Sequence, residues 1–214
     1  MKLSLTKNIG NFTTLARILF IFMSICLLNL NYFPLVCLGT VILVVAVIMD
    51  GMDGYLARKY NNSNKFGSLI DTLGDRITEN LLVIFFAYKH FIPLWIPLIF
   101  VSRSFLSDFV RFVCFRSGIG TFEINSSKWG FRFVASIKSR VGYLLLKIFV
   151  FLLGSAILCI ESSLSTSVFL NSVILLSLKE WLIYGSWILV AFNLIRFAFQ
   201  LYDSRSLLRK ELIN

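Results

Sequence analysis

Long apolar runs, each about as long as a membrane is thick, dominate this chain. A helix that crosses a bilayer needs roughly 20 consecutive, mostly apolar residues. Runs of about this length follow one another along the sequence, with short polar connections between them. The sequence therefore predicts an all-α integral membrane protein, with six transmembrane helices in a single domain over residues 1–214. The expected spans are 15–33, 34–58, 66–89, 92–115, 138–161 and 180–203.

The composition excludes an ordinary soluble domain. Hydrophobic residues make up 57% of the chain and charged residues only 15%, and the mean hydropathy is +0.82. The formal net charge of +10 is a value that nucleic-acid-binding proteins also show. In a membrane chain, however, Lys and Arg gather in the cytoplasmic connections and face anionic lipid. We therefore expect membrane lipid, and no nucleic acid, as a partner.

The basic residues also predict an orientation. Most of those that flank the spans lie at the N-terminus, in the second-to-third and fourth-to-fifth connections and in the C-terminal tail, whereas the opposite side has only Lys89 and Lys179. By the positive-inside rule, both termini are cytoplasmic. The start, Met1 to Asn11, is polar and leads into an apolar run longer than a signal-peptide core, so we expect the first span to be retained. The sequence thus predicts a multi-pass protein of the cell inner (plasma) membrane.

Some segments fall outside this pattern. Leu164 to Leu178 is apolar but short for a full crossing, so we expect an interfacial or re-entrant piece between the fifth and sixth spans. His90 is expected to be an exposed loop residue without a functional role. The cysteines have no CxxC spacing, which favours small core residues over a disulfide framework or a metal site. They are Cys26, Cys37, Cys114 and Cys159.

Four aspartates interrupt the apolar pattern where the second expected span ends and the third begins. Asp50 and Asp53 are three residues apart, and Asp71 and Asp75 are four apart, so each pair shares one face of a helix. Between them, Asn61-Asn62-Ser63-Asn64 favours a turn that would make the two helices antiparallel and bring the carboxylates together. Carboxylates are costly in a bilayer and usually face a wet interior. We therefore expect a polar cavity that opens to the cytoplasm.

The residue types around these carboxylates favour phosphate chemistry. Like charges this close cannot all stay ionised unless protons or divalent cations compensate them. Oxygen ligands select hard cations such as magnesium or manganese, and two such ions beside phosphate groups form a phosphoryl-transfer site. Gly54 and Ala57 leave room for a phosphorylated ligand, Arg58 offers a bidentate donor, and Gly67 permits close helix packing. Asp75 is the natural candidate for a base that deprotonates an attacking hydroxyl.

A simpler interpretation is that the aspartates are buried partners of Arg58 or solvated caps at helix ends. Either arrangement would explain one or two carboxylates, but neither explains four with small residues between them. A function from another class is a cation-coupled secondary transporter. Such a protein would place its carboxylates near the middle of the spans, often with internal repeats, whereas these cluster at one expected cytoplasmic end.

The same residues resemble a known family signature. Asp50 to Arg58 reads DxxDGxxAR, and after eight residues Gly67 to Asp75 reads GxxxDxxxD. This pattern is similar to that of the CDP-alcohol phosphotransferases, also called CDP-alcohol phosphatidyltransferases. The resemblance implies an integral membrane enzyme of phospholipid biosynthesis with six helices. Such a transferase moves the phosphatidyl group of CDP-diacylglycerol to a hydroxyl acceptor and releases CMP, and family members are often homodimers.

The resemblance also implies roles for single residues. A pair of divalent ions, Mg²⁺ or Mn²⁺, would be held by Asp50, Asp53 and Asp71, and Asp75 would share in this metal site or act as the base. The CDP moiety would be contacted by Gly54, Ala57, Arg58 and Gly67.

A weaker match lies at the N-terminus. The segment from Asn11 to Arg17 resembles the PNxxTxxR pattern of phosphatidylglycerophosphate synthases, with Gly10 where that pattern has Pro. In this interpretation Asn11 and Thr14 help to hold the nucleotide. The alternative is a helix cap, because Thr13 or Thr14 before an apolar run is common at helix starts.

The acceptor must be inferred from basic residues, because the aspartate signature is shared by enzymes with different acceptors. Ser102-Arg103, followed by Arg111, resembles a region of phosphatidylglycerophosphate synthases, although Ser104 stands where they have Glu; Lys138-Ser139 resembles their Lys-Thr pair. The phosphate of sn-glycerol 3-phosphate would be bound by Arg103, Arg111, Lys138 and Arg140.

Positive-inside topology explains any one of these cations equally well, but Arg103 and Arg111 lie inside an apolar helix, where a charge needs a reason. We therefore expect sn-glycerol 3-phosphate as acceptor first. Inositol phosphate, used by phosphatidylinositol phosphate synthases, comes second, since Arg76 beside Asp75 also occurs in some inositol-using relatives. Serine, used by phosphatidylserine synthases, comes third.

Overall fold

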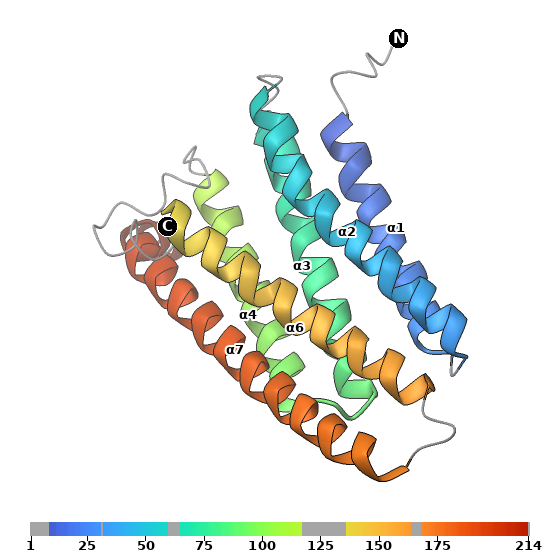
Figure 1. Cartoon of the computed structure of the whole chain (residues 1–214). Coiled ribbons are helices and arrows are strands. Elements are labelled where there is room, and N and C mark those ends of the chain that lie inside the picture. Colours follow the sequence, from blue (N-terminus) through green and yellow to red (C-terminus); the bar gives the residue numbers. More distant parts are fainter. Residues whose placement is uncertain (1–8, 31, 60–64, 117–135, 164–167, 214) are drawn as a thin grey trace. The chain divides into compact units, whose positions relative to one another are not determined.

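The computed structural model describes residues 9–30, 32–59, 65–116, 136–163 and 168–213, and these residues are helical apart from short turns (Figure 1). For residues 9–11, 50–59, 65–69, 71 and a few positions at the ends of the later helices, the backbone is described but the side chain is not. The described part of the chain forms six helices, as predicted. They are α1 (Ile9–Leu28), α2 (Phe33–Lys59), α3 (Lys65–Tyr88), α4 (Trp95–Arg116), α6 (Ile137–Ser163) and α7 (Val168–Ile213).

The bounds of the four middle helices agree with the expected segments to within about three residues, whereas those of the outer two differ. Helix α1 begins at Ile9, well before the expected start, and ends at Leu28. Helix α7 is continuous over 46 residues. The prediction of a separate piece over 164–178 was therefore wrong for residues 168–178, which form the first turns of α7. No glycine or proline interrupts those turns, so nothing in the local sequence breaks the helix before the apolar stretch that follows.

Two helices of the described chain are long and apolar enough to cross a membrane. Their candidate spans are Lys138–Ser163 in α6 and Val173–Arg205 in α7, and shorter apolar stretches, Phe12–Leu28 and Phe33–Met49, lie in α1 and α2. At about 1.5 Å per residue, α7 is much longer than the roughly 30 Å hydrocarbon core of a bilayer. One or both of its ends must therefore extend beyond that core.

Large apolar side chains are exposed and several charged side chains are buried, which differs from a soluble protein. Large apolar side chains such as Phe105 and Trp95 are 72% and 70% exposed, whereas Arg17, Glu79 and Lys147 are buried. Soluble proteins almost never bury such charges unless they are paired, and they rarely expose contiguous apolar surface. Exposed apolar side chains together with buried charged ones are what helices in lipid show.

The chain divides into two compact units, each described here by itself. The first unit comprises Met1–Phe91 and Phe151–Leu182, and so contains α1, α2, α3, the end of α6 and the start of α7. The second unit comprises Ile92–Val150 and Ile183–Asn214, and so contains α4, the start of α6 and the remainder of α7.

Small residues let the helices of the first unit approach closely. On α2, the carbonyl oxygen of Gly39 accepts a 2.8 Å hydrogen bond from Ser24 Oγ of α1, and a Cβ at Gly39 would lie 3.0 Å from Leu27 Cβ. On α6, a Cβ at Gly154 would lie 2.5 Å from Phe86 Cζ of α3. The hydrophobic driving force between helices is weak in lipid, so their association depends on the close packing that small residues permit.

Helix α3 ends in a Schellman motif. The Phe91 amide donates to the Phe86 carbonyl and the His90 amide to the Ala87 carbonyl, both at 3.0 Å. His90 has a φ of 58°, which is the left-handed conformation that this motif requires. Its exposed position in a turn is as predicted, whereas the flanking Phe86 and Phe91 are buried.

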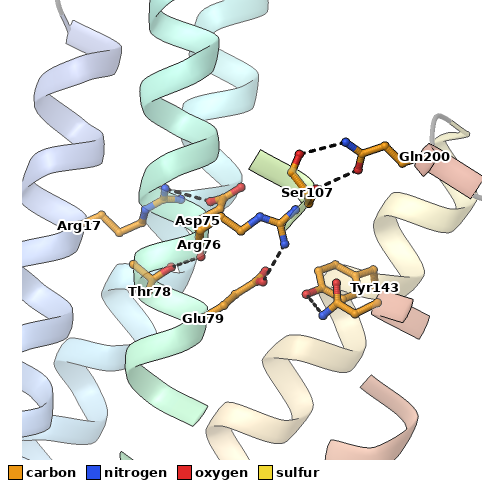
Figure 2. Close-up of polar contacts among 9 residues, drawn as sticks. Arg17, Asp75, Arg76, Thr78, Glu79, Ser107, Tyr143 and Gln200 are labelled. Atoms are coloured by element: carbon orange, nitrogen blue, oxygen red, sulfur yellow. Dashed lines mark hydrogen bonds and ion pairs between the residues drawn. The ribbon is translucent and has the colours of Figure 1, made fainter. Parts of the chain in front are cut away.

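The second unit is held by polar contacts between its helices. Ser107 Oγ of α4 donates to Gln200 Oε1 of α7 at 2.9 Å, and Gln200 Nε2 donates to the Ser107 carbonyl at 3.2 Å (Figure 2). Asn193 Nδ2 of α7 donates to the Tyr143 hydroxyl of α6 at 2.9 Å. In an apolar surrounding, such bonds fix helix register because the alternative is an unsatisfied polar group.

The cysteines agree with the sequence only in part. Cys114 is fully buried, but Cys26 is exposed, so the expectation that all four are core residues was wrong. In a membrane chain the outer surface is also apolar, and an apolar sequence neighbourhood therefore does not distinguish the core from the exterior. Cys37 of α2 and Cys159 of α6 are half-buried, with their Sγ atoms 3.9 Å apart.

Candidate active site

The four aspartates lie in α2 and α3 on either side of a short connection. Asp50 and Asp53 are in the last turns of α2, and Asp71 and Asp75 are in the first half of α3. The chain runs in opposite directions along the two helices, which are antiparallel (Figure 1). This confirms the predicted helical placement. The side chains of Asp50, Asp53 and Asp71 lie outside the described residues, so the convergence of all four carboxylates stays a prediction.

The expected CDP-contacting residues are placed only by their backbone. Gly54, Ala57 and Arg58 are in α2, Gly67 is in α3, and Asn11 is in the first turn of α1. Their side chains also lie outside the described part of the chain, and their predicted contacts remain predictions.

Asp75 has a described environment, and its partner comes from another helix. Arg17 of α1 reaches the carboxylate, with Nη2 2.9 Å from Oδ1 (Figure 2). The arginine side chain is 2% exposed and the aspartate side chain 38% exposed. Asp75 Oδ1 itself is buried, so the exposed part of this carboxyl group does not include the oxygen beside the guanidinium.

A glycine brings α1 and α3 together at this point. A Cβ on Gly74 would overlap Thr14 Cγ2 and would lie 2.9 Å from Arg17 Nη2. Thr14 is 1% exposed and sits inside α1, which begins at Ile9. The helix-cap interpretation of Thr13 and Thr14 was therefore wrong, because the helix starts earlier than the apolar run that suggested it.

The polar face of α3 continues beyond the aspartates. Glu79 follows Asp75 by four residues, is buried, and has its Oε2 atom 4.0 Å from Arg76 Nη1 (Figure 2). Thr78 Oγ1 donates to the Asp75 carbonyl at 3.0 Å. Glu79 was not predicted, although the repeated four-residue spacing of Asp71, Asp75 and Glu79 was a signal for it in the sequence. No local signal in the sequence indicates the partner of Arg17.

The expected acceptor-binding cations lie on α4 and α6. Arg103 of α4 is 6% exposed, and its Nε and Nη1 atoms are buried without a hydrogen-bond partner among the described residues. Arg111 of α4 is half-buried, and Lys138 and Arg140, near the start of α6, are exposed. Of these four, Arg103 is the one whose environment demands an anion, since an uncompensated buried charge is costly.

The donor set of the motif suits a hard divalent cation. It consists of carboxylates alone, which is the ligand chemistry that magnesium and manganese prefer. Among the side chains that the structure describes, no three His, Cys, Asp or Glu residues gather into a metal-binding group. Three of the four motif carboxylates lie outside that set, so their fit to metal rests on ligand type and spacing.

Comparison with known proteins agrees with this chemistry. A family model described as CDP-alcohol phosphatidyltransferase matches residues 7–192. The CDP-diacylglycerol--glycerol-3-phosphate 3-phosphatidyltransferase of Rickettsia typhi is 34% identical over 105 residues, covering 49% of this chain and 59% of the relative. The protein of the same name from Bacillus subtilis is 31% identical over 123 residues, covering 52% of this chain and 64% of the relative.

The chain thus spans about three fifths of the length of these curated relatives. The family match is more extensive. It includes every residue of both motifs, the whole of α1, α2, α3, α4 and α6, and α7 up to its middle. The chain belongs to the CDP-alcohol phosphatidyltransferase family.

Proposed function

We propose that this protein transfers the phosphatidyl group of CDP-diacylglycerol to a hydroxyl of sn-glycerol 3-phosphate, yielding phosphatidylglycerophosphate and CMP. The observation that carries the proposal is a complete aspartate signature within a family match over residues 7–192. The choice of acceptor is supported by relatives that carry the name of this activity. Inositol phosphate and serine are the competing acceptors.

In the proposed reaction, the acceptor oxygen attacks the β-phosphorus of the donor. A new oxygen–phosphorus bond forms, the bond from that phosphorus to the bridging oxygen breaks, and CMP leaves with the bridging oxygen. Asp75 takes the proton of the attacking hydroxyl, a role supported by the partial exposure of its carboxyl group. The lipid tails of the donor would lie between helices, in keeping with the large apolar side chains that the described helices expose.

The motif residues divide between metal and nucleotide. Asp50, Asp53 and Asp71 would hold two Mg²⁺ or Mn²⁺ ions, which when bound supply charge stabilisation at the phosphates; a share of Asp75 in this metal site is the alternative to its role as the base. Arg58 would donate to the pyrophosphate, with Gly54, Ala57 and Gly67 leaving space for it. Asn11 and Thr14 would support the nucleotide from α1.

An anionic acceptor needs cations, and Arg103 is the strongest candidate. Its buried guanidinium nitrogens without partners among the described residues are suited to a phosphate that completes them. Arg111, Lys138 and Arg140 would add charge at the same phosphate. Serine as acceptor, which carries a carboxylate but no phosphate, would need fewer cations.

The proposed setting is the inner (plasma) membrane, with both termini and a polar cavity on the cytoplasmic side. It is supported by the distribution of Lys and Arg along the sequence. A single domain over residues 1–214 and a homodimer are part of the same proposal.

The test is an acceptor panel with purified protein in detergent. Labelled CDP-diacylglycerol and magnesium are combined with sn-glycerol 3-phosphate, inositol phosphate or serine, and released CMP is measured. We expect glycerol phosphate to give the highest rate and Asp75→Asn to lower kcat by about 10² to 10⁴-fold, the usual contribution of a general base. The control is Lys179→Met, which removes the ion pair between Lys179 of α7 and Glu161 of α6. This variant should leave the rate unchanged.

Three results would contradict the proposal. Absence of CMP release with every acceptor would reject the reaction, and near wild-type activity of Asp75→Asn would reject the assigned base. A cation flux into liposomes that depends on the aspartates, without CMP release, would favour a secondary transporter instead.

A further inference from the structure

We infer that Arg17 is a positioning residue for Asp75: it holds the carboxylate through Oδ1 and leaves Oδ2 as the oxygen that receives the proton of the acceptor. The inference rests on the proposed function, and it assigns to the arginine of the N-terminal segment a role at the base and not at the nucleotide.

The first observation is electrostatic. A guanidinium stays charged at any physiological pH, and Arg17 is 2% exposed in an apolar helix. A charge in such a place needs a compensating anion, because burial of an unpaired ion is strongly unfavourable. Asp75, with its Oδ1 atom 2.9 Å from Nη2, supplies that anion.

The second observation concerns which carboxylate oxygen is used. Oδ1 is buried beside the arginine, although the Asp75 side chain as a whole is 38% exposed. The guanidinium therefore occupies one oxygen and restricts rotation of the carboxyl group. The other oxygen is left in the accessible part of the side chain, where a base must meet its substrate.

The third observation is that contacts around the pair restrict the backbone that carries Asp75. Thr14, one turn before Arg17 on α1, abuts Gly74, and a side chain at Gly74 would collide with both residues. On the other side, the Thr78 hydroxyl donates to the Asp75 carbonyl. Contacts from α1 and from the next turn of α3 thus hold the backbone of residues 74–75 while Arg17 holds the carboxylate.

The ion pair can be tested without any activity measurement. The thermal midpoints of wild type, Arg17→Met, Asp75→Asn and the double variant form a double-mutant cycle in detergent. We expect each single change to lower the midpoint by about 5 to 10 °C, and the double variant to lose clearly less than the sum, because removing both charges leaves no unpaired ion. Additive shifts would overturn the inference, since the two groups would then not interact.

The positioning role is tested by kinetics at saturating magnesium. Arg17→Met should lower kcat by about 10²-fold, the usual cost of misplacing a reacting group by about 1 Å. The KM for CDP-diacylglycerol and the affinity for CDP should stay within about threefold, because the substituted residue does not touch the donor. Arg17→Lys should recover part of kcat, since an ammonium restores the charge but not the planar fork.

Each alternative gives a distinct result. A large rise in the KM for the donor or in the Kd for CDP, with kcat intact, would show that Arg17 binds nucleotide and would overturn the inference. An unchanged kcat would reduce the pair to a structural role and overturn it as well. If the wild type releases no CMP with any acceptor, the proposed function fails and the positioning role fails with it, while the thermal cycle still decides whether the pair exists.

Discussion

The two units of this protein each bury an arginine in an apolar helix, and they treat it differently. In the first unit, Arg17 has the carboxylate of Asp75 within 2.9 Å. In the second unit, Arg103 is 6% exposed and has no ion pair with the side chains that the structure describes. Arg17 is thus compensated within its unit, whereas the described residues provide no anion for Arg103. The difference suggests a fixed catalytic base in one unit and a ligand-binding cation in the other.

Among the substitutions that test this difference between the units, Arg103→Met should have the largest effect. We expect Arg103→Met to raise the KM for sn-glycerol 3-phosphate by about 10- to 100-fold, because a charge-assisted hydrogen bond contributes about 1.5–3 kcal/mol. The same change should raise the thermal midpoint of the ligand-free protein, since it removes a buried and uncompensated ion. Steady-state kinetics and thermal unfolding in detergent measure both.

Arg17→Met is the matched comparison, because it makes the same substitution at an arginine with a partner. It should lower the midpoint where Arg103→Met raises it. If both variants lose stability to the same extent, Arg103 has a structural anion after all and the contrast between the units disappears.

A second test concerns the close approach of α1 and α3. Gly74→Ala places a Cβ against Thr14 Cγ2 and 2.9 Å from Arg17 Nη2. Helix α1 or the side chains of Thr14 and Arg17 must therefore shift. We expect a loss of about 1–3 kcal/mol in the free energy of unfolding, which is typical of overpacking, together with a lower kcat. Denaturant or thermal unfolding with a CMP-release assay checks both parameters.

Gly142→Ala provides the control on α6. A Cβ there would meet no atom within 4 Å, and alanine is a better helix former than glycine by about 1 kcal/mol. Stability should therefore stay equal or increase. A comparable loss at both glycines would mean that the measured cost does not come from the contact between α1 and α3.

The smallest expected effect concerns the polar contacts within the second unit. Ser107→Ala removes the 2.9 Å hydrogen bond to Gln200 Oε1 but keeps the bond that Gln200 Nε2 donates to the backbone carbonyl. We expect a loss of about 0.6 kcal/mol, the average for a hydrogen bond between membrane helices, with kcat unchanged. A large drop in kcat would place Ser107 in the active site and would make the second unit more than a binding region.

The fold could be predicted from the sequence where one physical constraint dominates. The length of apolar runs determined α2, α3, α4 and α6 to within about three residues, because hydrocarbon thickness sets the length of a spanning helix. The same rule failed for α7, where residues 168–178 are too few to cross but continue into the next apolar stretch. The rule also failed at the start of α1, because polar residues before the apolar run can be helical and a hydropathy rule does not include them in the helix.

The site could be predicted only where its residues are neighbours on a helix. The spacing of Asp71 and Asp75 places them on one face of α3, and the same logic, carried one step further, reaches Glu79. The partnership of Arg17 with Asp75 could not be foreseen in this way, because it depends on which turn of α1 packs against which turn of α3. Gly74 shows how local that dependence is, since one added carbon would prevent the approach.

By itself the sequence determined that this is an all-helical membrane protein, that its carboxylates gather beside one connection, and that the family is that of the CDP-alcohol phosphatidyltransferases, because length, periodicity and motif spacing are properties of the chain. Only the tertiary structure decided that Arg17 lies beside Asp75 and that Arg103 is buried without a described partner. Compensation of a buried charge is a property of the packed helices, since it depends on atoms that the fold brings within about 3 Å of one another.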